Sequence, residues 1–294
     1  MSHTAEDRDA VERHLARSVL ALAVTTGTAF SKNGELGQRD GTGGTDGQPE
    51  PSAAADPDLL AQPIRAGSAL TRGRCLELFD AQLASRHLDL AARWLRAQGA
   101  GFYTIGSSGH EGNAAVAAAL RLGDPALLHY RSCAFYLVRA AEAMPPRDGV
   151  GDVLLGLAAA VEEPLAGGRH KVLGHADLHT IPTTSTIASH LPRALGLAFS
   201  LDRAARLGAA ARWPADAIVL ASLGDASANH STAVGALNTA AYCAYQRLPL
   251  PLLIVCEDNG IGISVRTLPG WVAAAGAVVI PARRTPPPDW PLRR

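Results

Sequence analysis

The sequence predicts an α/β protein in which helices flank a parallel sheet. The clearest support is a strand–helix–strand unit: residues 217–223 and 252–256 are apolar and predict two buried strands, and residues 229–246 between them are helical. A connection of this length forces a right-handed parallel crossover. Each strand ends in a polar turn, at 224–227 and at 257–260. Because open α/β folds bind ligands at the carboxyl edge of the sheet, these turns are the first candidate site.

Composition limits the classes of protein to which the chain can belong. Its 294 residues carry 27 basic and 27 acidic side chains, and this zero net charge argues against a dedicated nucleic-acid binder. A chain of this length buries enough surface to fold without a disulfide or a metal. A hydrophobic content of 47% excludes wholesale disorder. No uncharged apolar run reaches the roughly 20 residues of a membrane span, so no membrane partner is expected.

The cysteines and the N-terminal charges both favour the cytoplasm. The uncharged stretch 18–31 has the character of an export-signal core, but four acidic residues precede it where such signals carry basic ones. The cysteines form no CxxC pair and predict buried thiols in a reducing compartment. They are Cys75, Cys133, Cys243 and Cys256.

The first 58 residues predict an arm and a linker ahead of the globular part. Residues 1–30 are expected to be a helical arm, with one amphipathic helix over 9–24. Residues 31–58 are rich in glycine and poor in large apolar side chains, so burial cannot offset their ordering entropy and a flexible linker is predicted. The globular domain is expected over 59–272, followed by a Pro/Arg-rich tail over 273–294.

Helical and strand patterns alternate through the globular part. Apolar side chains recur at helical spacing over 76–98, and Gly99 supplies a stop. The S-x-x-E form of residues 108–111 predicts a capping box that opens a helix. The apolar pattern of the first helix consists of Leu76, Phe79, Leu83, Leu90 and Trp94. The other predicted elements are helices over 113–122, 134–143, 153–161 and 187–207, a short strand over 126–130, and a glycine- and histidine-containing loop over 167–186.

The two polar turns hold the strongest candidate ligands. Asp225 and Asn259 each follow an apolar strand, and the crossover makes the two strand ends neighbours. Their carboxylate and carboxamide oxygens suit magnesium, which favours ligand phosphates. The small residues Gly224, Ala226 and Ser227 let a phosphate approach backbone N–H groups near the positive end of the following helix. The alternative is that Asp225 caps its helix and Asn259 lies in an ordinary turn.

Several motifs in one order resemble a known family. Gly224-Asp225-Ala226, followed by Glu257-Asp258-Asn259, is similar to the GDG…NN signature of thiamine diphosphate enzymes. Upstream motifs are Gly109-His-Glu-Gly112, Tyr130-Arg131, Gly167-Gly-Arg169 and Thr184-Ser-Thr-Ile187 to Pro192, and residues 259–265 continue the pattern. Over roughly residues 70–272 the chain resembles alpha subunits of 2-oxoacid dehydrogenases, the decarboxylating component. The branched-chain (2-oxoisovalerate) type is the most similar.

The resemblance implies a thiamine diphosphate-binding fold and a role for each matched residue. Asp225, Asn259 and the main-chain oxygen of Ile261 would coordinate magnesium. Tyr130 and Arg131 would bind the diphosphate. Ile187 would be the apolar side chain that holds the cofactor in its bent conformation. The alternative for Arg131 is a surface arginine, but its position directly after a predicted strand favours the phosphate role. Without the resemblance, Ile187 would be interpreted as helix core. The implied cofactor-binding residues are Tyr130, Arg131, Ser185, Ile187, Gly224, Asp225, Ala226, Ser227, Asn259 and Ile261.

The resemblance also implies an activity and partners. The reaction would be oxidative decarboxylation of a small, branched-chain 2-oxoacid with acyl transfer to a lipoyl-bearing acyltransferase. The glutamate that acts on the aminopyrimidine would come from a beta subunit or beta half of the same enzyme. The alternatives are a cofactor-binding remnant or interaction subunit without turnover and, more weakly, a transketolase-like enzyme. Because residues after 277 do not resemble the family, a truncated or frame-shifted product is expected.

The sequence departs from the family pattern in three places. Ala226 replaces a glycine, which is tolerable if its φ is negative; Asp258 replaces an asparagine, and about five additional residues lie around 245–250. None of these removes a proposed metal ligand.

His175 and His179 have the i, i+4 spacing of two metal ligands on one helix, but the Ile-Pro that follows argues against a helix. One or two of His170, His175 and His179 are expected to line the substrate entrance. His110-Glu111 is no zincin motif, because no second histidine follows.

Overall fold

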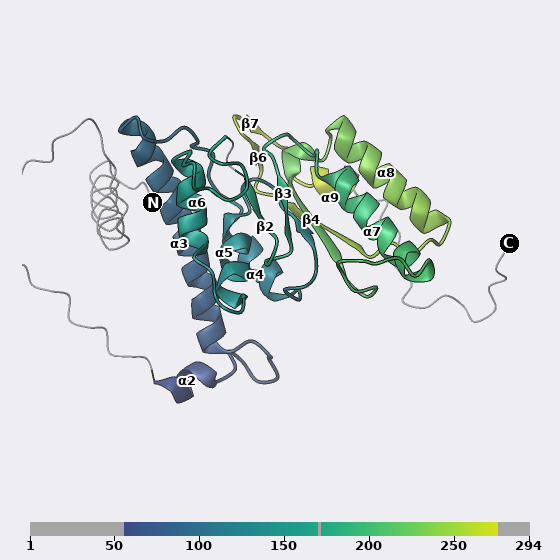
Figure 1. Cartoon of the computed structure of the whole chain (residues 1–294), viewed down its shortest axis with the longest axis horizontal. Helices are drawn as coiled ribbons and strands as arrows, with labels where there is room; N and C mark the ends of the chain where they lie inside the picture. The colour runs from purple at the N-terminus through teal and green to yellow at the C-terminus, as the bar shows by residue number, and fades with distance from the viewer. Residues whose placement is uncertain (1–55, 170–171, 276–294) are drawn as a thin grey trace, which may run out of the picture. The chain divides into compact units, whose positions relative to one another are not determined.

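Figure 1 shows the computed structural model, which describes residues 56–169 and 172–275. The predicted helix over 9–24, nearly all of the predicted linker and nearly all of the Pro/Arg-rich tail lie outside these residues. Two compact units divide the chain between Leu83 and Ala84.

The described part of the first unit begins with α2 (Pro57–Ala61), where the side chain of Asp56 accepts a hydrogen bond from the Asp58 N–H. The last two residues assigned to the predicted linker therefore belong to this helix. The long helix α3 (Arg72–Ala97) follows and continues into the second unit. It confirms the helix predicted over 76–98, and Gly99 follows it with φ +68, as its predicted role as a stop requires.

The second unit contains a five-stranded sheet in the order β2-β3-β1-β4-β5. Strands β3, β1, β4 and β5 are parallel, and β2 pairs antiparallel with β3. This confirms an α/β fold with a mostly parallel central sheet flanked by helices. The strands are β1 (Ala126–Leu127), β2 (Leu173–His175), β3 (Thr180–Thr183), β4 (Val219–Gly224) and β5 (Leu252–Glu257). Beyond β5, β6 (Ile261–Gly262) and β7 (Val265–Arg266) form a separate antiparallel pair.

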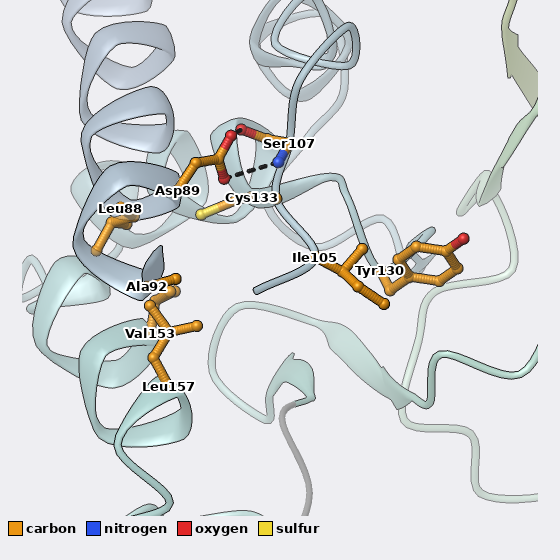
Figure 2. A pocket seen from close by; sticks show the side chains of 10 residues that line it. Leu88, Asp89, Ala92, Ile105, Ser107, Tyr130, Cys133, Val153 and Leu157 are labelled. Atoms are coloured by element: carbon orange, nitrogen blue, oxygen red, sulfur yellow. Dashed lines mark hydrogen bonds between the residues drawn. The ribbon is translucent and has the colours of Figure 1, made fainter. Parts of the chain in front are cut away.

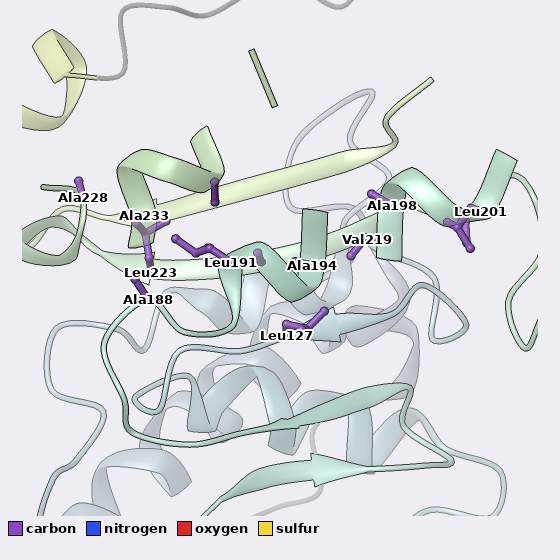
Figure 3. Close-up of a cluster of buried hydrophobic side chains, with 13 residues drawn as sticks. Leu127, Ala188, Leu191, Ala194, Ala198, Leu201, Val219, Leu223, Ala228 and Ala233 are labelled. Carbon is purple, nitrogen blue, oxygen red and sulfur yellow. The ribbon is translucent and has the colours of Figure 1, made fainter. Parts of the chain in front are cut away.

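Helices lie on both faces of the sheet. The helices after α3 are α4 (Asn113–Ala118), α5 (Cys133–Glu142), α6 (Gly149–Leu157), α7 (Leu191–Arg206), α8 (Ser231–Tyr245) and the short α9 (Trp271–Ala275). Figure 3 shows α7 and α8 against one face of the sheet, where apolar side chains of α7 pack against those of β4. Six consecutive residues of β4 are buried because helices cover both sides of this central strand. None of the helices in the described ranges is both long and apolar enough to cross a membrane.

The structure corrects several element predictions. Residues 167–186 do not form one loop, because β2 and β3 lie within them. The capping box at 108–111 is wrong: Gly112 is the N-cap of α4 and contributes no side-chain hydrogen bond. Helix α7 begins at Leu191, four residues later than predicted, and β1 is only two residues long. Strand β5 is only partly buried, because it is the edge strand of the described sheet.

Two further predictions concerned which side chains are buried. In α3 the apolar core side chains are Leu78, Leu88, Ala91, Ala92 and Leu95, whereas Leu76 and Phe79 of the predicted apolar pattern are more than half exposed. Small residues therefore make up much of the buried face of this helix. The four cysteines are free thiols, but only Cys133 and Cys243 are buried; Cys75 and Cys256 are partly exposed.

Candidate cofactor site at the carboxyl edge of the sheet

The predicted magnesium turn lies at the carboxyl end of β4. In the parallel register of β4 and β5, Gly224 pairs with Glu257, so the polar turns after both strands start at the same edge. Asp225 opens a single 3₁₀ turn, Asp225–Ser227, and its side chain is almost fully buried. The carboxylate accepts a hydrogen bond from the hydroxyl of Thr267, which lies just beyond β7. The crossover therefore places Asp225 where the strand pattern predicted it.

The segment after β5 packs against this turn. The side-chain oxygen of Asn259 accepts a hydrogen bond from the Ile261 N–H at 3.2 Å. Strand β6 then lies so close to the 3₁₀ turn that a Cβ added to Gly262 would be 2.5 Å from the Cβ of Ala226. Ala226 is not among the described residues with positive φ, so the predicted condition for its replacing a glycine is met. Its methyl group fits because residue 262 is a glycine.

The predicted diphosphate residues follow the neighbouring strand β1. The Arg131 guanidinium donates a hydrogen bond to the Gly106 carbonyl at 2.7 Å and lies 5.2 Å from the centre of the Tyr130 ring. Burial raises the pKa of Tyr103, and a hydrogen bond with the Ser185 hydroxyl lowers it in part. The charge of Tyr130 raises this pKa further, and the charge of Arg131 lowers it. Three predicted site residues thus gather around Tyr103.

Ile187 occupies a different environment from that of a core residue. It lies four residues before α7 begins, and 40% of its surface is exposed. The helix-core alternative for Ile187 is therefore wrong. An exposed apolar side chain that shares a short segment with Ser185 is available to contact an apolar part of a ligand.

A cluster that sequence reasoning missed lies behind the turn. His110 is buried, and its Nδ1 forms a hydrogen bond with the carboxylate of Glu257. The His129 ring stacks on that of His110 at 4.9 Å between centroids. The two rings lie near Gly224, where an added Cβ would be 3.4 Å from His110. The sequence offered one signal for this cluster, which is that His110 belongs to the Gly109–Gly112 motif and His129 directly precedes Tyr130.

The stacked rings are a poor site for one shared metal ion. His110, His129 and Glu257 each place one possible ligand atom within 4.8 Å of the others. However, the ring planes differ by only 8°, so their in-plane lone pairs lie in two separate parallel planes. We therefore interpret this cluster as a polar support under the Gly224 turn.

Negative charge is concentrated at this edge of the sheet. Burial, and then the charges of Asp225, Asp258 and Glu257, raise the pKa of the Cys256 thiol to about 11. One oxygen of Glu257 is buried without a hydrogen-bond partner. A diphosphate placed here would be repelled unless a cation lay between the charges. The side-chain oxygens of Asp225 and Asn259 match the ligand preference of magnesium. The residues present therefore fit a diphosphate together with a magnesium ion.

Two histidines of the predicted loop form hydrogen bonds at the β2–β3 hairpin. His175 ends β2, and its Nδ1 accepts a hydrogen bond from the Asp177 N–H. His179 lies in the β2–β3 turn with φ +47 and accepts a hydrogen bond from the Trp213 indole at 3.0 Å. The two residues therefore stabilise a hairpin, and no helical metal pair exists between them. His170 lies outside the described residues.

A small cavity lies beside Tyr130 (Figure 2). Its volume of about 10 Å³ is close to the minimum that holds one water molecule, so it is too small for an organic substrate. Its lining residues are Leu88, Asp89, Ala92, Ile105, Gly106, Ser107, Tyr130, Cys133, Val153 and Leu157. The cavity is therefore an irregularity in the core beside the site.

Comparison with known proteins agrees with this geometry. A family model described as the dehydrogenase E1 component matches residues 80–272, which include every predicted site residue. No curated protein shows significant similarity to the chain. Because the match spans more than half of the chain and the described sheet is of the expected type, the chain belongs to the dehydrogenase E1 component family, the thiamine diphosphate-dependent 2-oxoacid dehydrogenases.

Proposed function

We propose that this chain is the alpha portion of a 2-oxoacid dehydrogenase that binds thiamine diphosphate through magnesium. The supporting observation is the meeting of the Asp225 turn with the Asn259–Gly262 segment at the carboxyl edge of the sheet, one strand away from Tyr130 and Arg131. Ligands of open α/β folds bind at this edge. The proposal includes a branched-chain 2-oxoacid substrate, for which the sequence resemblance is the support.

The residues of the chain would bind and orient the cofactor. Asp225, Asn259 and the main-chain oxygen of Ile261 would hold magnesium, which offsets the negative charge described above. Arg131 and Tyr130 would donate hydrogen bonds to the diphosphate oxygens. When bound, thiamine diphosphate supplies the electron sink for decarboxylation of the 2-oxoacid.

The other end of the cofactor would contact the segment before α7. Ser185 would contact the aminopyrimidine, and the exposed side chain of Ile187 would support the bent cofactor. The proton-transferring glutamate would come from the beta partner, and the acyl group would pass to a lipoyl-bearing acyltransferase. The four cysteines are free thiols, which suits a reducing compartment such as the cytoplasm.

Calorimetric titration of the full chain with thiamine diphosphate in the presence of magnesium tests the binding site. Asp225→Ala removes a buried proposed ligand, whereas Asp258→Ala removes an exposed carboxylate nearby and serves as the matched control. We expect a loss of affinity of at least tenfold for Asp225→Ala and little change for Asp258→Ala. Equal affinity of wild type and Asp225→Ala would refute the site.

Turnover separates the enzyme from its alternatives. The chain is combined with a beta partner, and decarboxylation of 2-oxoisovalerate, pyruvate and 2-oxoglutarate is measured with an artificial electron acceptor. A preference for 2-oxoisovalerate supports the branched-chain type. Cofactor binding without turnover of any 2-oxoacid supports the remnant or interaction subunit, and transfer of a ketol group between sugar phosphates supports the transketolase-like alternative.

A further inference from the structure

A buried carboxylate on α3 is not among the predicted cofactor ligands. Asp89 is only 6% exposed. Its Oδ1 accepts a hydrogen bond from the Ser107 N–H at 2.8 Å, and its Oδ2 accepts one from the Ser107 hydroxyl at 3.1 Å (Figure 2). The guanidinium of Arg86 lies 2.8 Å from the same carboxylate, and the Ser85 hydroxyl donates to that of Ser107. Ser107 is therefore held by two residues of one helix.

The loop that contains Ser107 contacts the candidate cofactor site at two points. The carbonyl of Gly106 accepts the 2.7 Å hydrogen bond from Arg131. At Gly109, an added Cβ would lie 2.5 Å from the side-chain nitrogen of Asn259. Residues 106–109 thus contact the proposed diphosphate arginine and a proposed magnesium ligand. We call residues 106–111 the bridging loop.

The carboxylate of Asp89 is packed directly against the bridging loop. A Cβ added to Gly106 would lie 2.2 Å from the Asp89 Cγ, so the backbone approaches the carboxylate as closely as a residue without a side chain allows. Arg86 also reaches Glu111 at 3.3 Å, and Glu111 accepts a hydrogen bond from the Gly109 N–H at 2.9 Å. One arginine therefore connects Asp89 to the far end of the loop.

Without the carboxylate, the loop would have a different conformation. The Ser107 N–H is buried, and leaving a buried donor unpaired is costly, so the loop would move to find another acceptor. The Gly106 carbonyl would move with it and release Arg131. A long, flexible side chain that is not held in place must be ordered when the ligand binds, which weakens binding.

We propose that Asp89 is a positioning residue for the cofactor site: it holds the bridging loop at Ser107 and thereby orients Arg131 through the Gly106 carbonyl. This inference rests on the proposed function of Arg131. It makes α3, which supplies no predicted ligand, part of the machinery that prepares the diphosphate site. If Asp89 instead only stabilises the fold, its loss affects cofactor affinity no more than the loss of any similar buried carboxylate.

The chain offers a matched control at the other end of β1. Asp124 is also buried, and it likewise accepts hydrogen bonds from two backbone N–H groups and an arginine. It precedes β1, whereas Arg131 follows this strand, so it lies away from the candidate site. Asp89→Ala and Asp124→Ala are compared for thermal unfolding and for calorimetric affinity for thiamine diphosphate with magnesium. Both should lower the unfolding temperature, and only Asp89→Ala should weaken binding, by about tenfold.

Two more measurements separate positioning from general stability. Asp89→Ala in an Arg131→Ala background should weaken binding no further, because the route through Arg131 is already lost. Asp89→Asn keeps one acceptor for the Ser107 N–H, so it should recover part of the affinity; it also replaces Asp89→Ala if that variant fails to fold. Additive losses in the double variant, or equal losses for Asp89→Ala and Asp124→Ala, would overturn the proposal.

Hydrogen exchange on the unliganded chain distinguishes failure of this inference from failure of the proposed function. Amides of residues 106–111 should exchange faster in the Asp89 variant than in wild type, and those of α8 should not. Unchanged exchange in the bridging loop overturns the positioning role. If wild type binds no thiamine diphosphate while the exchange of the loop increases as expected, the proposed function fails and Asp89 is left as a loop anchor without a cofactor role.

Discussion

Gly109 allows a strong test of the contact between the bridging loop and Asn259. Its φ is +86, so an alanine there costs about 1–2 kcal/mol of backbone strain. The new Cβ would also lie 2.5 Å from the Asn259 side-chain nitrogen, a separation that real atoms do not adopt, so the amide must move. The hydrogen bond from the Ile261 N–H to Asn259 would then be lost, which costs about another 0.5–1.5 kcal/mol.

Gly109→Ala should therefore lower the free energy of unfolding by about 2–3 kcal/mol and weaken magnesium-dependent cofactor binding by about 10–100-fold, because a proposed metal ligand is displaced. The control is Gly99→Ala: its φ is +68, but no atom lies within 4 Å of the added Cβ. It should cost only the backbone strain, about 1–2 kcal/mol, and leave binding unchanged.

Urea denaturation gives the free energies of unfolding, and calorimetry gives the affinity for thiamine diphosphate over a series of magnesium concentrations. The reasoning is refuted if Gly109→Ala and Gly99→Ala lose equal stability and both retain the magnesium dependence of wild type. That result would mean that the position of Asn259 is independent of the bridging loop.

Three further substitutions test the fold and the site. Burial raises the pKa of Asp124, but hydrogen bonds from the Arg121 side chain and from two backbone N–H groups outweigh burial and lower it overall. Its carboxylate therefore stabilises the fold above the unfolded-state pKa of about 4 and ceases to do so as the pH falls through the lower, folded-state pKa. Asp124→Asn should thus unfold at less urea than wild type at pH 7, with the two midpoints converging below about pH 4; a constant difference contradicts this. Arg139 is fully buried and donates hydrogen bonds at 2.7 and 2.9 Å to the carbonyls of Asp124 and Leu178. Arg139→Met should therefore lower the free energy of unfolding, measured by urea denaturation, by about 3–5 kcal/mol. A loss under about 1 kcal/mol would argue against a stabilising role for these hydrogen bonds. Gly262→Ala should weaken cofactor binding by its clash with Ala226, and adding Ala226→Gly should restore the affinity measured by calorimetry; failure of this rescue rules out the clash as the cause.

Local patterns predicted the elements with long apolar repeats and failed for the short ones. Strand β4 and helix α8 were evident because the order strand, helix, strand is written in consecutive residues. The β2–β3 hairpin was missed because its strands have only three and four residues and an irregular register, which is too short for an alternating pattern. In α3, the periodicity identified the helix but not its buried face, since alanines make up much of that face.

The candidate site shows the same division. The positions of Asp225 and Asn259 at one sheet edge could be predicted, because crossover handedness follows from chain connectivity and places consecutive parallel strand ends together. The hydrogen bond between His110 and Glu257 could not, because the two residues are 147 positions apart and no periodicity relates them. The contact of Ser107 with Asp89 had no signal for the same reason.

The sequence by itself thus determined the α/β class, the parallel strand pair and the two polar turns, because these depend on local apolar patterns and on the direction of one connection. Only the tertiary structure decided which faces are buried, how the bridging loop is held and which polar groups support the turns. Those features depend on shape complementarity and on hydrogen bonds between distant residues. Such contacts form only when the helices and strands have packed together.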